Sequence, residues 1–441
     1  MSMSGEEIVA LSKQFTFTPW VKQGDVNPLP ITRAEGVYIY TADGKKILDF
    51  NSQLMSVLIG HGHKKVIAAM KKALDEVIYV YPGMTTEPRA RLGKLMAEIT
   101  PGDINTFFFT LGGAEANENA MRAARLMTGR QKILSRYRSY HGATNATMQL
   151  TGDPRRWANE PGTPGIIRVM DPTPYNYSFG KTDAEKTENN LRYLEEVIMY
   201  EGPQNIAAMF VETVPGTNGV LIPPKGYLKG LKQLLEKNGI LMICDEVMAG
   251  LGRTGKMFAF EHFDIVPDMV TMAKGLTSSY FPMGCVGMSD KVAKHFKDNV
   301  FWGGLTYANH PVGMATAEAV ITVMREEGMI ENAAKLEKVM REEMDKLQAK
   351  HKSVLECRCI GLFGMVDLRK NSKNEPLAPY NGAHPAMAKL NKAFLENGLF
   401  TFTRWNNFTC NPPLCITEAQ LREGFAIIDK CLAITDEAFE G

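Results

Sequence analysis

The sequence has no excess of either charge and no long apolar segment, and each absence excludes a class of protein. Its 50 Lys and Arg residues are balanced by 49 Asp and Glu residues, which leaves a formal net charge of +1. Binding to nucleic acid or to an anionic membrane surface usually needs a basic excess, so we expect neither partner. No apolar run approaches the roughly 18 residues of a membrane span, and the first residues do not resemble a secretory signal. We therefore expect a cytoplasmic protein.

The sequence also lacks a disulfide framework and a metal-binding pattern. Its 7 cysteines are an odd number, and only Cys357 and Cys359 lie close together, without a second such pair or nearby histidines. Buried free thiols account best for these residues. His61 and His63 flank Gly62 with no further ligand at a suitable spacing, which favours a turn. We assign no metal.

The middle of the chain predicts an α/β fold. Short apolar runs alternate there with helical patterns, which is typical of βαβ units and a mostly parallel sheet. Five of these runs are followed by glycines or polar residues; they span residues 105–110, 132–135, 207–211, 240–244 and 269–273. Ligands of open α/β sheets bind outside the carboxyl ends of the strands, so we expect these ends to converge on one crevice.

The two ends of the chain predict a second, smaller domain. After residue 309 the pattern becomes helical, breaks at Gly328 and continues through an amphipathic stretch at 331–351. Strand-like runs follow at 359–366 and 399–402, and a last helix is expected from 418 to about 434. With the strands expected around 36–50, these elements suggest an α+β lobe. We predict a large domain over residues 61–321 and a small domain made of residues 1–60 and 322–441.

Lys274 and Asp245 form the strongest candidate for a catalytic pair. Lys274 follows an apolar strand and precedes Gly275, so its amine is expected in the crevice. Burial and nearby positive charge lower the pKa of such an amine, which can then form a Schiff base with a carbonyl. A lysine at a strand end is more often solvated, but Asp245 ends another strand 29 positions earlier, about one βαβ unit away. A buried carboxylate needs a cationic partner such as the protonated ring nitrogen of pyridoxal 5'-phosphate.

Two further segments suit the same cofactor. At Gly112-Gly113-Ala114 a strand gives way to a helix, whose free N–H groups and dipole attract a phosphate. Tyr140 and His141 follow another strand, and the tyrosine offers a face for stacking on a pyridine ring, although a lone aromatic residue is more often a packing residue.

These residues together resemble the class III (ω-amino acid) aminotransferases, which are pyridoxal phosphate enzymes of fold type I. The resemblance spans nearly the whole chain. Its most specific segments are Asp245-Glu246-Val247, the glycine-rich run 250–255, Ala273-Lys274-Gly275 and Gly304-Leu305-Thr306-Tyr307. It implies a transaminase with ping-pong kinetics, a large domain with a mostly parallel sheet, and a smaller α+β domain.

The resemblance implies a role for each residue around the cofactor ring. Lys274 would hold the cofactor as a Schiff base and carry the proton between substrate and cofactor. Asp245 would hold the ring nitrogen, Val247 and Tyr140 would pack on opposite ring faces, and His141 would lie beside Tyr140.

It also implies how the phosphate and a substrate carboxylate are held. Backbone N–H groups of Gly113 and Ala114 would bind the phosphate, and Thr306 would reach it from the neighbouring subunit of a homodimer. Many relatives carry hydroxyl side chains where this chain has Gly112 and Ala114, so backbone donors gain importance here. Arg404 resembles the carboxylate-binding arginine of the family. Glu212 is counted among the cofactor-binding residues. When the donor lacks an α-carboxylate, we expect the Arg404 guanidinium either to pair with Glu212 or to move toward solvent.

The amino donor is predicted from three shorter segments, 17–20, 113–118 and 404–406, which look most like the taurine aminotransferases of that family. Trp20 and Trp405 would wall a pocket for a short sulfonate, or else pack at the lobe boundary. We predict transfer of the amino group from taurine, with β-alanine as a further donor, to 2-oxoglutarate or pyruvate. β-Alanine or 4-aminobutyrate as the main donor is the alternative.

Other classes of protein share some of these sequence features. The run 250–255 fits the dinucleotide pattern G-x-G-x-x-G, which suggests a nicotinamide oxidoreductase. That pattern should open a helix directly after its strand and be followed by an acid at the end of the next strand, where this chain has Lys274. A non-catalytic protein on the same fold would be expected to lose Lys274 or Asp245. An aminomutase or racemase would keep the same cofactor residues.

Overall fold

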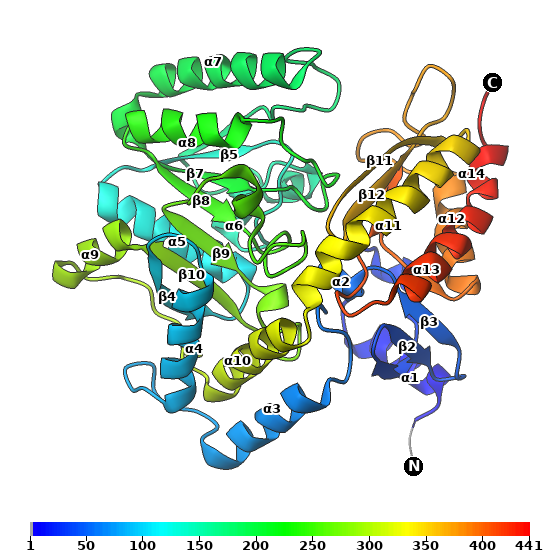
Figure 1. The fold of residues 1–441 in the computed structure, drawn as a ribbon, viewed down its shortest axis with the longest axis horizontal. Helices are drawn as coiled ribbons and strands as arrows, with labels where there is room; N and C mark the ends of the chain where they lie inside the picture. The colour runs from blue at the N-terminus through cyan, green and yellow to red at the C-terminus, as the bar shows by residue number, and fades with distance from the viewer. Residues whose placement is uncertain (1–2) are drawn as a thin grey trace.

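The largest sheet of the computed structural model, which describes residues 3–441, has the strand order β4-β10-β9-β8-β7-β5-β6 (Figure 1). Its strands are β4 (Ile104–Thr110), β5 (Lys132–Arg136), β6 (Ile166–Val169), β7 (Ile206–Glu212), β8 (Leu241–Asp245), β9 (Met269–Met272) and β10 (Gly284–Ser289). The strands from β9 to β6 are parallel, while β10 is antiparallel to both β9 and β4. The predicted α/β fold with a mostly parallel sheet is confirmed, and the five expected strands match to within about a residue.

Helices cover both faces of this sheet, which explains the unbroken apolar runs of its strands. On one face, Phe210 of β7 and Ile243 of β8 pack against α5 (Gly113–Thr128). On the other face, Met209 and Met242 belong to the core formed with the helices α7 and α8. These two helices span Asp183–Glu201 and Tyr227–Lys237. Every residue of β7 is buried.

Further helices surround the sheet. None of the helices within residues 3–441 combines the length and apolar character needed to cross a membrane. The helices α3 and α4 pack against α10, and α4 also contacts β4. These three helices span Lys64–Glu76 (α3), Glu87–Ile99 (α4) and Pro311–Glu326 (α10). Two more helices of the large domain are α6 (Asn145–Leu150) and α9 (Asp290–Asp298).

Segments from both ends of the sequence form the lobe on the right of Figure 1, which contains two four-stranded sheets. One has the order β1 (Ile31–Glu35), β2 (Tyr38–Thr41), β3 (Lys46–Asp49) and β13 (Leu399–Phe400). The other has the order β11 (Val354–Ile360), β12 (Phe363–Leu368), β15 (Asn407–Cys410) and β14 (Thr403–Arg404). The helices of this lobe are α1 (Gly5–Phe15), α2 (Ser52–Met55), α11 (Met329–Lys350), α12 (Pro385–Glu396), α13 (Glu418–Cys431) and α14 (Ala433–Glu437).

The pairing of β3 with β13 joins strands from opposite ends of the chain. It supports the proposal that residues 1–60 and 322–441 form one small domain, although the boundaries themselves stay a prediction. Gly328 lies between α10 and α11 with a φ of +60°, so the expected helix break is confirmed.

The run 359–366, expected to be strand-like throughout, contains the turn of a hairpin between β11 and β12. The turn occurs at Gly361, where φ is +57° and an added Cβ would lie 2.3 Å from the carbonyl carbon of Thr254. Because the residues on both sides of this glycine are apolar, the sequence pattern did not indicate a turn there. The last helix also differs from expectation, because α13 ends at Cys431 and α14 continues separately.

The glycine-rich run 250–255 forms turns between the two lobes and opens no helix. Arg253 within it is fully buried and donates to the carbonyls of Leu362 (2.9 Å) and Pro412 (2.6 Å) and to the hydroxyl of Ser52 (2.9 Å). The run therefore has a structural role, whereas the dinucleotide interpretation predicted a role in binding a cofactor. All 7 cysteines are free thiols, and all except the partly exposed Cys415 are buried, as expected.

Candidate active site

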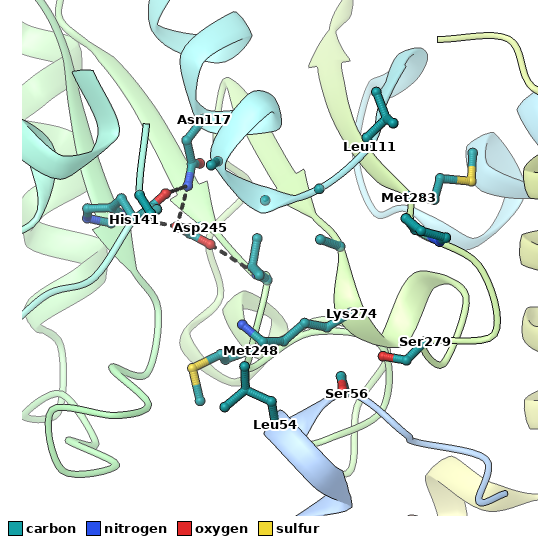
Figure 2. Close-up of a pocket in the computed structure, with 18 of the residues that line it drawn as sticks. Leu54, Ser56, Leu111, Asn117, His141, Asp245, Met248, Lys274, Ser279 and Met283 are labelled. Atoms are coloured by element: carbon teal, nitrogen blue, oxygen red, sulfur yellow. Dashed lines mark hydrogen bonds and ion pairs between the residues drawn. The ribbon is translucent and has the colours of Figure 1, made fainter. Parts of the chain in front are cut away.

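A cavity of about 530 Å³ opens at the carboxyl ends of the central strands (Figure 2). It receives residues from the segments that follow β4, β5, β8 and β9 and from the last residue of β7, and Leu54 and Ser56 line it from the other lobe. The predicted crevice is therefore present. Its lining includes these predicted site residues: Gly113, Ala114, Tyr140, His141, Glu212, Asp245, Val247 and Lys274. Trp20, Arg404 and Thr306 lie outside the lining.

Lys274 begins a short 3-10 turn just after β9 and adopts a φ of +45°, an uncommon value for a residue with a side chain. Its amine points across the cavity toward the side on which Asp245 lies (Figure 2). Burial lowers the pKa of this amine, and the charge of Arg155 lowers it further, while the carboxylates of Asp245 and Glu212 partly oppose the shift. A lowered pKa increases the fraction of neutral amine, which is the nucleophilic form.

Asp245, the last residue of β8, is held by partners on three sides. Its Oδ2 accepts a hydrogen bond from the Asn117 amide at 2.8 Å and lies 2.8 Å from Nδ1 of His141. Its Oδ1 accepts from the backbone N–H of Val247 at 3.0 Å. Since a carboxylate only accepts, His141 donates from Nδ1. Asp245 ends β8 and Lys274 follows β9, and these two strands are parallel neighbours, as the spacing in the sequence predicted.

Asn117, which sequence reasoning missed, fixes this carboxylate from α5. Its amide nitrogen also donates to the carbonyl of His141 at 2.8 Å, and its Oδ1 accepts from the hydroxyl of Thr271 at 2.7 Å. Asn117 is 1% exposed, so these bonds replace the water that a surface amide would bind. Asn117 therefore orients Asp245 and His141 together.

The start of α5 forms a seat for an anion at another part of the cavity. Gly112 is the N-cap residue, and the first N–H groups of the helix have no partner within it. An added Cβ on Gly113 would lie 3.1 Å from both methyl groups of Val247, so this glycine permits close contact between the helix and that side chain. Residues 112–114 offer backbone donors and no hydroxyl.

The donor set of the cavity fits pyridoxal phosphate. The anion seat suits its phosphate, Lys274 suits its aldehyde, and the anchored carboxylate of Asp245 suits its ring nitrogen. Nε2 of His141 is buried without a hydrogen-bond partner among the residues that the structure describes.

Glu212, the last residue of β7, holds the backbone near the cavity and does not bond Arg404. It accepts from the N–H groups of Tyr140 at 2.8 Å and of Gly216 at 3.1 Å. Burial raises its pKa, partly opposed by the neighbouring His141. In this structure the carboxylate that pairs with Arg404 is Asp153, so the expected pairing of Glu212 with Arg404 is not found here.

The partner of Arg404 is Asp153, a second residue that sequence reasoning missed. Nη2 of Arg404 lies 3.2 Å from Oδ2 of Asp153, and Nη1 donates to the carbonyl of Thr217 at 3.1 Å. The Arg404 guanidinium packs 4.1 Å from the ring centre of Trp405. Asp153 caps the short 3-10 helix at Pro154–Asn159, and the Asp-Pro pair is the one sequence feature that pointed to such a cap.

Arg155 joins the same carboxylate to the aromatic wall of the cavity. Its guanidinium bonds Asp153 and lies 3.6 Å from the ring centre of Tyr140 and 5.5 Å from that of Trp20. Trp20 in turn meets Tyr140 edge-on at 6.1 Å. Trp20 thus reaches the site through Tyr140 and Arg155, although 61% of its surface is exposed.

Thr306 lies in the loop between α9 and α10, beside a second cavity of about 500 Å³. Its carbonyl accepts from the hydroxyl of Tyr79 at 2.9 Å. Within one chain the structure does not bring Thr306 to the main cavity.

This fold and this donor set define a pyridoxal phosphate-dependent transferase of fold type I. The family model described as Aminotransferase class-III matches residues 21–432, and the chain belongs to this family. It is therefore a pyridoxal phosphate-dependent transaminase, as the resemblance of its sequence implied.

The names of individual relatives specify different amino donors. The chain is 32% identical to the taurine–pyruvate aminotransferase of Bilophila wadsworthia, with 100% of both chains covered. It is also 32% identical to the putrescine–pyruvate aminotransferase of Pseudomonas aeruginosa, with 96% of this chain and 94% of the relative covered. The structure of taurine:2-oxoglutarate aminotransferase from Bifidobacterium kashiwanohense, in complex with pyridoxal phosphate and glutamate, matches with a TM-score of 0.96 and 40% identity over 99% of each chain.

Proposed function

We propose that this transaminase moves the amino group of taurine to 2-oxoglutarate or pyruvate, with β-alanine as a further donor. The observation that carries the proposal is the place of Arg155 beside Tyr140 and Trp20. The Nε and Nη2 groups of Arg155 bond Asp153 and Thr217, and Nη1 makes no hydrogen bond within residues 3–441. A donor group with a fixed positive charge, packed against the cavity-lining residue Tyr140, suits the terminal acid group of a short amine.

The charges beside the cavity favour an acidic donor over a simple amine. Arg155 and Arg404 share the single carboxylate of Asp153, so these three side chains carry one net positive charge. A sulfonate or carboxylate neutralises that charge, whereas an alkyl diamine adds to it. The relatives named for taurine support the same choice, while the relative named for putrescine matches at equal identity in sequence.

The proposed roles of the residues follow from their positions. When bound, the cofactor supplies an aldehyde that condenses with amines and an electron-withdrawing ring. Lys274 would hold that aldehyde, and its amine would move the proton at the donor carbon. Asp245 would keep the ring nitrogen charged, and Val247 and Tyr140 would pack against the ring. Gly113, with its neighbour in the first turn of α5, would hold the phosphate.

We further propose a homodimer in which Thr306 reaches the phosphate in the neighbouring subunit. Large apolar side chains are exposed in the two segments next to Thr306, as a subunit contact would require. They are Val77, Ile78, Tyr79, Tyr81, Met84, Val300, Trp302 and Tyr307. The cytoplasmic location stays a prediction.

The test is a panel of donors and acceptors with the purified enzyme. We expect the highest kcat/KM for taurine among taurine, β-alanine and 4-aminobutyrate, each tried with pyruvate and 2-oxoglutarate. A preference for either of the other two donors would replace taurine in the proposal, and no transfer from any of them would refute it.

A variant of Arg155 tests the residue that carries the proposal. Arg155→Met should raise the KM for taurine by about 10- to 100-fold, the effect of one lost charge-assisted hydrogen bond, and should spare an alkyl amine without an acid group. Arg156→Met is the matched control, because Arg156 bonds Glu160 and the carbonyl of Gly152 instead of Asp153. Equal losses with taurine and with the alkyl amine would contradict the assignment.

A further inference from the structure

The short helix α2 brings Leu54 to the active-site cavity with an unusual backbone. Three of its four residues, Ser52, Gln53 and Met55, have φ values of +47°, +58° and +53°. A positive φ is uncommon for a residue with a side chain, and it persists only where the surrounding structure imposes it. Gln53 also has a ψ of −98°, which lies outside the left-handed helical region. The structure around α2 must therefore hold it in this conformation.

The carboxylate of Asp49, whose side chain is 0% exposed, holds this helix from below the cavity wall. Its Oδ1 accepts from the backbone N–H groups of Asn51 at 3.3 Å and of Gln53 at 2.9 Å, and its Oδ2 accepts from the side-chain amide of Gln53 at 2.9 Å. The Asn51 amide donates to the carbonyl of Gln53 at 2.6 Å, and the hydroxyl of Ser52 donates to the carbonyl of Asn411 at 2.7 Å. The residue with the most unusual backbone is thus the one that Asp49 binds most.

His61 fixes the position of Asp49. Nε2 of His61 lies 2.9 Å from Oδ2 of Asp49, and Nε2 is the donor because a carboxylate only accepts. The backbone of His61 is bound in both directions to Gly36: its N–H donates to the Gly36 carbonyl at 2.7 Å, and its carbonyl accepts from the Gly36 N–H at 2.9 Å. The imidazole therefore acts from a fixed backbone.

The chain around His61 is also bound to the turn that follows Lys274. The hydroxyl of Tyr280 donates to the carbonyl of Gly60 at 2.8 Å and accepts from the N–H of His63 at 2.7 Å. Because this turn begins with the residue that carries the reactive amine, the histidine–aspartate pair connects that amine with the wall of the cavity that α2 forms.

Leu54 lines the cavity together with Ser56, and Figure 2 shows its side chain pointing toward the amine of Lys274. We propose that Asp49 and His61 are positioning residues that hold Leu54 at the reacting end of the substrate. The pair thereby limits the size of the group that a substrate can carry on the carbon that bears its amine. The inference rests on the transaminase activity of the family and is independent of the choice of taurine as the donor.

The test measures how strongly the enzyme discriminates by size. The two substrates are the amine that the enzyme uses best and its analogue with one more methyl group on the carbon that bears the amine. We expect Asp49→Asn to lower the ratio of their kcat/KM values about tenfold, in favour of the analogue. The reason is that the NH₂ group of asparagine cannot accept from these N–H donors, so the wall carrying Leu54 can move away from the substrate.

Three further variants separate positioning from a general loss of stability. Leu54→Ala should lower the same ratio, and adding Asp49→Asn to it should change the ratio little, because the side chain that the pair positions is already absent. His61→Phe should act like Asp49→Asn, whereas His61→Gln keeps an N–H donor and should resemble the wild type.

His351→Phe is the matched control. Nδ1 of His351 lies 2.7 Å from Oδ2 of Asp436, and neither residue lines the cavity. This variant should lower the temperature of thermal unfolding and leave the ratio of the two kcat/KM values unchanged.

An unchanged ratio in Asp49→Asn, which includes no turnover of the analogue by either enzyme, would overturn the proposal. So would an equal change with and without the Leu54 side chain, or a change of the same size in His351→Phe. If Asp49→Asn does not fold, His61→Phe is compared with His61→Gln, and equal ratios in these two variants would overturn it. Since the amine is whichever one the enzyme uses best, failure of taurine as a donor leaves this test intact.

Discussion

Replacing Glu246 with glutamine should change the stability of the protein in opposite directions at low and high pH. Glu246 follows Asp245, is fully buried, and accepts hydrogen bonds from the hydroxyl of Thr213 and the N–H groups of Ala259 (2.8 Å) and Phe260 (3.1 Å). Burial raises the pKa of Glu246 to about 7, with the charge of Asp245 adding to the shift and the three hydrogen bonds opposing it.

The size and sign of the effect follow from this shift. The folded protein binds the Glu246 proton more tightly than the unfolded chain, whose value is 4.5. The resulting stability is fully present below pH 4.5 and is lost as the pH rises through about 7, a change of about 3 kcal/mol. Glutamine does not titrate, but its NH₂ group must face one of the N–H donors, which costs about 1–2 kcal/mol at every pH. Relative to the wild type, Glu246→Gln should therefore be less stable at pH 5 and about 1–2 kcal/mol more stable at pH 8.

The assay is the free energy of unfolding by urea at pH 5, 6, 7 and 8, with the same excess of cofactor throughout. The quantity of interest is the difference between variant and wild type, since other titrating groups cancel in it. Glu261→Gln is the control, because Glu261 bonds the N–H of Phe258 at the same short helix and is partly exposed. A difference for Glu246→Gln that stays constant or declines from pH 5 to pH 8 would refute the reasoning.

Two other changes test the parts of the site that hold the cofactor. Asn117→Ala removes one hydrogen bond to Asp245 and leaves the buried carbonyl of His141 without that donor. We expect a loss of about 1–3 kcal/mol in stability, measured by thermal unfolding. We also expect weaker binding of pyridoxal phosphate, measured by cofactor titration. Gly113→Ala places a methyl group 3.1 Å from the side chain of Val247, so the affinity for the cofactor should fall several-fold while the protein still folds. An unchanged titration curve would show that Val247 can move to make room for the methyl group.

Asp245 and Lys274 could be identified from the sequence because they lie at the ends of strands buried on both faces. Such strands appear as unbroken apolar runs, and a charged residue directly after one is conspicuous. The strands β6 and β10 escaped notice because β6 resembles any short apolar run and β10 contains two glycines in Gly284–Ser289. The turn at Gly361 was hidden for a similar reason, since its neighbours are apolar.

Asn117, Asp153 and Arg155 were missed because their roles depend on tertiary contacts. Asn117 lies among Ala, Glu and Asn residues of a helix, which is also the composition of a solvent-facing turn. Asp153 and Arg155 lie where no periodic pattern exists, and the contact of Asp153 with Arg404 spans more than half of the chain. The role of Thr306 depends on a second copy of the chain and stays a prediction.

Arg253 has a consequence for the order in which the protein can be completed. Its acceptors near residues 52, 362 and 412 are 201, 109 and 159 positions away. A nascent chain has made the whole large sheet by residue 289, yet the last acceptor, the Pro412 carbonyl, must still be synthesised and leave the ribosome. Until then this cation lacks its full set of acceptors, so we expect the junction between the lobes to close late during biosynthesis.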